Sequence, residues 1–406
     1  MGHGLQPDPT DMQDTRQECW ALDFVGGYMK KSILLAISMA IISTIVTNVV
    51  EASNDVEVRG QVTDISIPMF TWNALNFPGF FYDIDENIGT EQITLSLSGM
   101  ESTSAILYGD VGPDGNRGII YSTTAQPKDF KFKPWGRYNL IGFLGEGYFV
   151  SYDSTITQGM KDHQESVAYL YDNSQDKNLL TNLQISKVLI DDSTEQVVTS
   201  SKPLKLKEGY ELNLKSVEAN ANTATLELTK NSKVVDSKVV VPSRPDATMS
   251  DKTYYYKAEI GATKGIVQIA VHFKNAFRAS EDLANIDGVF QISDEPISVE
   301  PNQQYDKMMV RTVDDSTDTI TMDNKDYRVL LNKNKDIVLM QNIHIKTANQ
   351  DTVNDTNPLR YYIYKTITGE PETTDEGNSD TNSATPTREE TSREPKPSSD
   401  TVNEGL

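Results

Sequence analysis

Residues Phe70 to Glu91, FTWNALNFPGFFYDIDENIGTE, form the densest run of aromatic residues in the chain. Pro78-Gly79 places a turn signal in the middle of the run. Because each ring can bury roughly 150–250 Å², such a cluster anchors either a core or an interface. Two interpretations are open: a sugar-binding platform or glycosidase cleft made of rings and acids, or the folded corner of a large β domain. The rings are Phe70, Trp72, Phe77, Phe80, Phe81 and Tyr82, and the acids that follow are Asp83, Asp85, Glu86 and Glu91.

The residues that follow this stretch favour the β interpretation. Gln92–Leu97 and Asp129–Lys133 alternate apolar and polar residues, which is the pattern of a half-buried strand. The run from Tyr138 to Tyr152 consists of two apolar segments separated by Gly145-Glu146-Gly147. That arrangement predicts a hairpin or a bulge.

The second half of the chain predicts a β-sandwich. Leu204–Val241 forms a meander with about ten residues per strand, a spacing typical of sandwiches. Residues 159–180 are polar and predict a short helix or a long loop, and Arg278–Asp282 predicts one helical turn. Further strands are predicted at Leu183–Ile190, Thr253–Ile260, Ile266–Phe273, Gly288–Ile292, Met308–Val313 and Ile343–Thr347.

The N-terminal residues indicate targeting rather than a folded element. Lys30-Lys31 precedes nineteen uncharged residues, and Glu51-Ala52-Ser53 follows them. This order predicts a signal peptide at 29–52, cleaved between Ala52 and Ser53. The alternative is an uncleaved transmembrane anchor, since about 18 uncharged residues can span a bilayer. Residues 1–28 fit no part of a signal peptide, so we expect them to be an upstream extension from a mis-assigned start codon.

Charge and composition exclude several classes of protein. The formal net charge of −22 disfavours binding to nucleic acid or to anionic lipid. Cys19, the one cysteine, precedes the predicted cleavage site, so the mature chain has no disulfide. Residues 366–406 are rich in Thr, Ser, Pro and acids. They predict a disordered, acidic stalk of the kind that carries O-linked glycans.

The sequence contains few residues placed for chemistry. The three histidines after the signal peptide are not in a metal-ligand spacing, and no nucleophile elbow or phosphate loop is present. Two carboxylates beside rings suit glycosidase chemistry, but among 59 acids such a neighbourhood is expected by chance. We therefore predict no enzyme activity. The histidines are His163, His272 and His344, and the candidate carboxylates are Asp83, Asp85, Glu86, Glu91 and Glu146.

Two polar loops are candidate sites. Asp314-Asp315-Ser316-Thr317-Asp318 offers oxygen ligands for calcium but lacks the loop pattern of a known site, so a solvated turn is favoured. Asn354-Asp355-Thr356 is a glycosylation sequon in a polar loop of a chain with a secretion signal. Asn354 is thus the candidate glycosylation site.

Long segments of the chain, in order, resemble the S-layer duplication domain of methanogenic archaea. The likeness covers about Val58 to Tyr364. It is specific because many long segments match rather than one short motif. Those segments are VRGQVTDI, the opening stretch, IIYSTTAQPKDFKFKPWGRYNLIGFLGEGYFVSY, LLTNLQISKVLIDD, LKLKEGYELNLKSVEAN, VDSKVVVPS, YYYKAEIG, VHFKNAFRASEDLANIDGVFQISD and YDKMMV.

The resemblance implies an all-β unit of two sandwich-like subdomains, which we place at 53–200 and 201–365. It also implies a structural role at the cell surface, where such units tile with copies or relatives into a porous lattice. Divalent cations are possible at its acidic contacts. The rings of the opening stretch then belong to the core. The alternative is a secreted or surface-anchored adhesin or carbohydrate-binding module that uses the rings near Trp72.

The chain departs from the family pattern in two ways. Lattice-forming members resemble a tandem of two such units, and this chain has one. They also end in a Thr/Pro-rich spacer and a transmembrane helix, of which only the spacer is evident here. The expected explanations are an accessory envelope protein, a secreted form, or a shortened reading frame.

Overall fold

The computed structural model describes residues 55–97, 99–101, 104–107, 118–162, 168–174, 176–218, 220 and 222–368. The predicted extension at 1–28, the signal peptide with Ala52 and Ser53, and all but three residues of the predicted stalk lie outside these residues, as do Cys19 and His163. The predicted all-β architecture is confirmed, with antiparallel ladders throughout the described sheets. Within the described part, no helix has the length and apolarity needed to cross a bilayer.

Three sheets, one of which pairs the first described strand with the last, together form what we call the terminal lobe. The sheets have the orders β1-β27-β26-β25 with β2 beside β27, β21-β22-β23-β7-β4-β3, and β24-β6-β5. The bounds are β1 Asp55–Arg59, β2 Thr63–Asp64, β3 Met69–Asn73, β4 Glu91–Ser96, β5 Gly99–Glu101, β6 Ser104–Leu107, β7 Gly118–Thr124, β21 Gln304–Tyr305, β22 Met308–Asp314, β23 Thr319–Asp323, β24 Val329–Leu331, β25 Asp336–Met340, β26 Ile343–Thr347 and β27 Arg360–Thr368.

The remaining two sheets form the central lobe, residues 126–298. A nine-stranded sheet has the order β17-β18-β19-β11-β10-β9-β8, with β12 on β19 and β20 on β11, and a four-stranded sheet has the order β13-β14-β15-β16. The bounds are β8 Gln126–Asp129, β9 Arg137–Phe143, β10 Glu146–Asp153, β11 Gln184–Asp192, β12 Gln196–Thr199, β13 Leu204–Lys205, β14 Tyr210–Glu218, β15 Thr223–Lys230, β16 Lys233–Val240, β17 Thr253–Ile260, β18 Thr263–Arg278, β19 Asp282–Ile292 and β20 Ile297–Ser298.

Short helices lie between some of these strands. Residues 159–180, where a short helix or a long loop was predicted, contain α3 and most of α2. The bounds are η1 Lys133–Trp135, α2 Gln158–Asp162, α3 Tyr169–Ser174, η2 Leu180–Asn182 and α4 Met249–Lys252.

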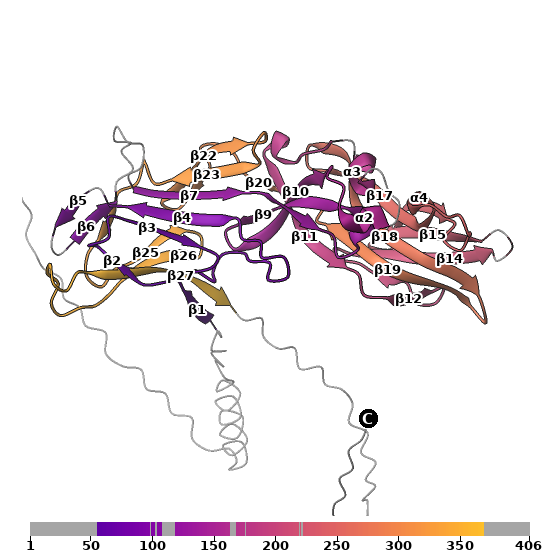
Figure 1. Cartoon of the computed structure of the whole chain (residues 1–406), viewed down its shortest axis with the longest axis horizontal. Coiled ribbons are helices and arrows are strands. Elements are labelled where there is room, and N and C mark those ends of the chain that lie inside the picture. The colour runs from indigo at the N-terminus through magenta and orange to yellow at the C-terminus, as the bar shows by residue number, and fades with distance from the viewer. Residues whose placement is uncertain are drawn as a thin grey trace, which may run out of the picture. The chain divides into compact units, whose positions relative to one another are not determined.

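This topology differs from the predicted division into 53–200 and 201–365. Strands β21 to β27, all after residue 300, share sheets with strands from the first 124 residues, through the pairs β23–β7, β24–β6 and β27–β1. The segment between them folds separately as the central lobe. Indigo and yellow strands therefore share the same sheets in Figure 1. The first lobe is assembled from the two ends of the described chain, with the second inserted between them.

The nine-stranded sheet is buried on both faces. In β18, Ile269 and Val271 pack in the core shared with the four-stranded sheet, whereas Ile266 and Ala270 pack in a second core on the other face. At the β9 end, Phe143 belongs to the core of the terminal lobe. Burial on both faces explains why β18 has eight consecutive buried residues, Ile266 to Phe273, instead of an alternating pattern.

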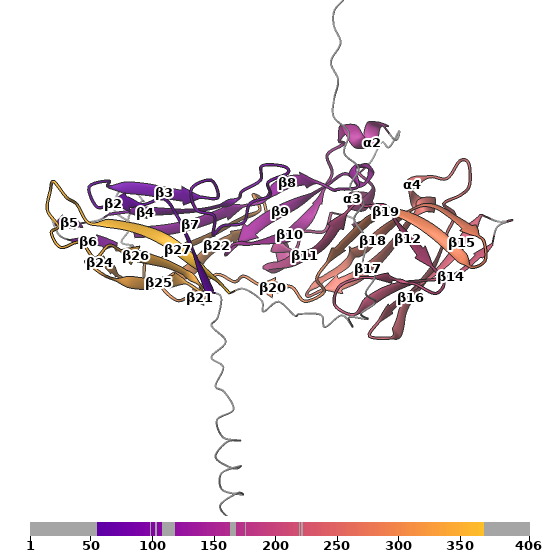
Figure 2. The same cartoon turned by 90° about the horizontal axis from the view of Figure 1, so that it is seen from below.

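The first and last described strands lie side by side in both views (Figures 1 and 2). In the β1–β27 ladder, Asp55 is opposite Thr368 and Arg59 is opposite Tyr364. The chain therefore enters and leaves the described fold at neighbouring positions.

Candidate functional site

Three of the six rings of the opening stretch are core residues, as the family resemblance implied. Trp72 and Phe77 are fully buried and Phe80 is nearly so. Trp72 Nε1 donates to the backbone oxygen of Gln61 at 2.8 Å, which satisfies its one polar group. Because its ring is enclosed, Trp72 cannot present a platform to a sugar. Of the six rings, only Tyr82 has a large exposed fraction, at 36%.

Of the four acids in the stretch, Glu91 alone is buried. Glu91 begins β4 and is 1% exposed. Its carboxylate accepts hydrogen bonds from Phe81 N at 2.8 Å, Tyr121 Oη at 2.9 Å and Gly145 N at 3.0 Å. The side chain thus ties the loop after Pro78 to β7 and to the β9–β10 turn.

Lys365 of β27 reaches the same place from the far end of the chain. Its Nζ donates to the backbone oxygen of Leu144 at 2.9 Å. A Cβ at Gly145 would lie 2.2 Å from this Nζ and 2.3 Å from the oxygen of Gly79, and the φ of Gly145 is +83°. Glycine is therefore required where the two lobes meet.

Burial controls the electrostatics of this junction. It raises the pKa of Glu91 to about 7, although the three donors and the nearby charge of Lys365 oppose the shift. Burial likewise lowers the pKa of Lys365, against the attraction of Glu146 and Glu91.

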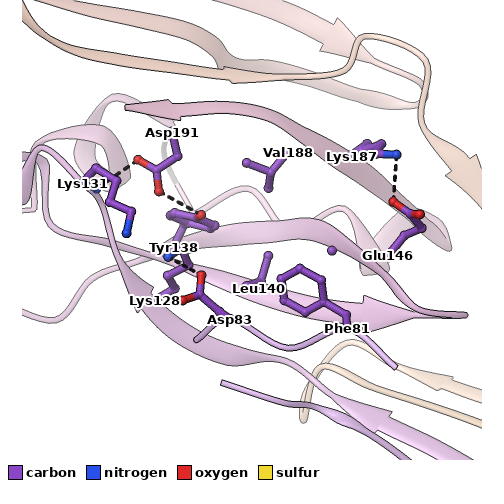
Figure 3. Close-up of a pocket in the computed structure, with 11 residues that line it drawn as sticks. Phe81, Asp83, Lys128, Lys131, Tyr138, Leu140, Glu146, Lys187, Val188 and Asp191 are labelled. Atoms are coloured by element: carbon purple, nitrogen blue, oxygen red, sulfur yellow. Dashed lines mark hydrogen bonds and ion pairs between the residues drawn. The ribbon is translucent and has the colours of Figure 1, made fainter. Parts of the chain in front are cut away.

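A groove of about 300 Å³ lies beside this junction, between the loop that follows Phe81 and strands β9 to β11 (Figure 3). Its apolar part is made of Phe81, Leu140 and Val188. A Cβ at Gly147 would lie 2.6 Å from the Phe81 ring, so the ring rests on the glycine backbone. The loop is thus packed closely against the nine-stranded sheet.

Ion pairs occupy the groove at both ends (Figure 3). Lys128, which is buried, pairs with Asp83 at 2.7 Å, and Lys187 pairs with Glu146 at 2.8 Å. Burial alone would raise the pKa of Asp83, but Lys128 and backbone donors outweigh it and hold that pKa below its usual range. The Lys187–Glu146 pair is about half exposed, so it contributes little to stability.

Asp191 is a third acid that lines the groove, with Asp83 and Glu146. It accepts from Tyr138 Oη at 3.1 Å and from Lys131 N at 3.0 Å. Burial raises its pKa, and these donors together with the charge of Lys128 counteract the rise. Asp191 therefore fixes the segment after β8 against β11.

The candidate catalytic carboxylates all have structural partners. Asp83 and Glu86 lie near Lys128, Asp85 pairs with Lys131, Glu146 pairs with Lys187, and Glu91 is enclosed by donors. The structure brings Asp83, Asp85 and Glu86 together with lysines of the central lobe rather than across an open cleft. The arrangement attaches one lobe to the other.

Each of the two described histidines contacts an aspartate side chain. His272 contacts Asp287 and stacks on Phe132, with ring centroids 4.2 Å apart, and His344 Nδ1 lies 3.1 Å from Asp336. Within the described ranges, no three histidine, cysteine or acidic side chains are grouped to hold a metal ion.

The two candidate loops are both ordered by local hydrogen bonds. Asp314 caps its own turn through Ser316, and Asp318 accepts from Asn178 at 2.7 Å. Asn354 is exposed, and its Oδ1 accepts from Thr356 N at 3.0 Å and Thr356 Oγ1 at 2.9 Å. The residues that follow Asn354 in the loop, 355 to 357, are exposed as well. The Asn354 amide is therefore accessible to an enzyme that would modify it.

Comparison with known proteins gives a consistent result. The family model described as S-layer protein matches residues 62–349. The chain is similar to the major S-layer proteins of Methanosarcina mazei, Methanosarcina acetivorans and Methanosarcina barkeri, with identities of 26%, 26% and 25%, each over 84% of this chain. The alignments cover 47%, 47% and 46% of those proteins. The chain thus spans about half the length of the curated relatives it matches.

Proposed function

Because this chain belongs to the S-layer protein family, we propose that it is a structural, non-enzymatic protein of the cell envelope that packs with copies of itself or with related S-layer proteins. It is an extracellular protein of the cell surface. One observation carries the proposal: the family match, 62–349, nearly coincides with the fold, 55–368. The matched segment is the fold itself rather than a motif attached to another domain.

The charge of the chain supports a porous acidic layer. Without residues 1–52 the chain still has 34 basic and 53 acidic residues, and a surface this acidic favours cations over anions at any opening between copies. In this proposal divalent cations bind between copies, where acids of two chains meet and supply oxygen ligands. We propose neither a nucleic-acid partner nor a resident cofactor.

The test is to image isolated envelopes and follow the protein during chelation. We expect the full chain in a two-dimensional array on the cell surface. Chelation of divalent cations should release it, and adding calcium or magnesium back should restore the array. A chain that is always a soluble monomer in envelope extracts, indifferent to chelators, would contradict lattice assembly.

The alternative of an adhesin that binds carbohydrate through the rings near Trp72 has no structural support. It depended on accessible rings near Trp72, and Trp72 is fully buried. The enzyme alternative needs two free carboxylates facing a substrate, and the five candidate carboxylates are engaged with lysines or buried donors.

A further inference from the structure

A second cleft, of about 440 Å³, lies on the terminal-lobe side of the β9–β10 hairpin. Three distant parts of the chain line it: the hairpin, the segment that includes β20 and β21, and the turn between β25 and β26. We call it the tyrosine cleft. Its lining includes Tyr148, Ile297, Gln303, Tyr305 and Gln341.

Two tyrosine rings form the walls of the tyrosine cleft. Both contact Phe143 edge to face, with centroid distances of 6.4 Å for Tyr148 and 5.8 Å for Tyr305. Phe143 is 2% exposed and fixed in the core of the terminal lobe. Each tyrosine is therefore held by its contact with Phe143 while part of its own surface stays open to the cleft. Ile297, 36% exposed, adds an apolar patch.

The polar groups of the cleft have hydrogen-bonding capacity left over. Within the part of the chain that the structure describes, neither tyrosine hydroxyl and no side-chain atom of Gln341 has a hydrogen-bond partner. Gln303 Oε1 accepts from Glu300 N at 3.0 Å, which leaves its Nε2 available. Burial raises the pKa of Tyr148 to about 12 and also raises that of Tyr305. Both hydroxyls therefore remain protonated donors at neutral pH.

The described lining of the cleft offers no free charge that would select an ion. Glu146 is the one charged residue in that lining, and Lys187 neutralises it at 2.8 Å. Apolar rings with a few convergent hydroxyls and amides match a ligand that has one apolar face and many uncharged hydroxyls. We propose that the tyrosine cleft binds a neutral pyranose, with the sugar against Tyr148 and Tyr305 and its hydroxyls bonded to Gln303 and Gln341.

The site is separate from the buried rings around Trp72. The other class of ligand that aromatic grooves take is a proline-containing peptide in an extended conformation. The chain itself offers one in residues 369–406, but that segment has ten acids and three bases. The described lining residues supply no unpaired cation to match these acids, and this favours the sugar.

The test uses the purified full-length chain and saturation-transfer NMR with the neutral methyl pyranosides of glucose, galactose, mannose and N-acetylglucosamine. We expect transfer to at least one of them. Gln341→Ala, at an exposed position, should weaken binding about threefold to tenfold through the loss of a hydrogen bond. Tyr305→Ala should weaken it by about tenfold or more. Tyr82→Ala is the matched control, since it removes an exposed tyrosine outside the cleft.

Melting temperatures identify a variant that fails to fold. If Tyr305→Ala is unfolded, the pyranoside binding of Gln341→Ala tests the proposal. No transfer to any of the four sugars, or binding that is unchanged in Gln341→Ala and in a folded Tyr305→Ala, would overturn the proposal. Binding of a peptide of residues 369–406 in place of the sugars would overturn it as well.

A second experiment identifies the source of the sugar, with the immobilised chain offered envelope protein before and after chemical deglycosylation. If the chain captures only the intact envelope protein, the ligand is a glycan linked to protein. If the chain captures both forms equally and still binds the pyranosides, the ligand is a free saccharide. Neither result depends on lattice assembly.

Discussion

The carboxylate of Glu91 accepts the backbone N–H of Gly145, 54 residues further along the chain, at 3.0 Å. This bond lies at the contact between the terminal lobe and the central lobe. Tyr121 and Phe81 donate to the same carboxylate. One buried side chain thus completes the hydrogen bonds of three separate segments.

Replacing Glu91 with Ala should therefore destabilise the fold. The change leaves two backbone N–H groups and a tyrosine hydroxyl without an acceptor in a buried site, and each such loss costs about 1–3 kcal/mol. We expect a loss of about 3–5 kcal/mol in the free energy of unfolding, measured by urea denaturation. Glu146→Ala is the control, since its half-exposed ion pair is worth about 0–1 kcal/mol. Equal effects of the two changes would contradict the role assigned to Glu91.

The same residue predicts a pH dependence. Its pKa is about 7 in the fold, above the usual value of 4.5, so the folded chain binds more protons than the unfolded chain between these values. The contribution of Glu91 to stability is complete below pH 4.5 and is lost as pH rises through 7. The wild-type stability should fall by up to about 3 kcal/mol over this interval relative to Glu91→Gln. A relative rise would show that the three donors outweigh burial and keep the carboxylate ionised.

Gly145 offers a test of how closely the lobes pack. Gly145→Ala places a methyl group against Lys365 Nζ and the oxygen of Gly79, in addition to the cost of positive φ. Gly265→Ala is the matched control, because its φ is +72° and nothing lies within 4 Å of the added carbon. We expect Gly265→Ala to cost about 1–2 kcal/mol and Gly145→Ala to cost clearly more in thermal or urea unfolding. Equal costs would mean that the junction yields to the methyl group.

Local patterns predicted much of this fold. The hairpin at 138–152 and the meander at 204–241 are present as β9–β10 and β13–β16. The predicted strand at Asp129–Lys133 was wrong beyond Asp129. β8 ends at that residue, Phe130 is buried in the core, and η1 begins at Lys133. The predicted helical turn at Arg278–Asp282 was wrong. Arg278 and Asp282 lie opposite each other across the tight β18–β19 turn. Their ion pair of 3.0 Å has the i,i+4 spacing that is also found in helices.

Long-range relationships were not predictable in this way. Periodicity identifies a strand but not its partner, so the return of β21–β27 to the terminal lobe had no local signal. The contact of Lys365, in contrast, did have a local signal in the sequence. In Arg360–Thr368, alternation places Lys365 on the same face as Tyr361 and Ile363, both fully buried. A lone lysine on a core face indicates a buried partner, which is the Leu144 oxygen here.

The sequon at Asn354 predicts a specific modification of the native protein. Asn354 is exposed, and the hydroxyl of Thr356 donates to its Oδ1 at 2.9 Å. We expect the peptide containing Asn354 to carry a glycan mass when the protein is purified from its native host. Thr356→Ala should abolish this mass and Thr356→Ser should retain it, because serine preserves both the sequon and the hydroxyl. An unmodified wild-type peptide would exclude this site.

Trp72→Ala separates the core role of the opening stretch from sugar binding. The ring is fully buried, packs against Phe70 and Tyr361, and donates to Gln61. Its removal should cost about 3–5 kcal/mol of stability, measured by urea denaturation. Leu75→Ala is the control in the adjoining turn, where the side chain is 76% exposed and its loss should be nearly neutral. A Trp72→Ala variant of unchanged stability that had lost glycan binding would restore the platform interpretation. We expect lower stability, with pyranoside binding retained by the folded fraction. That result would support a core role for the Trp72 ring and a sugar site in the tyrosine cleft.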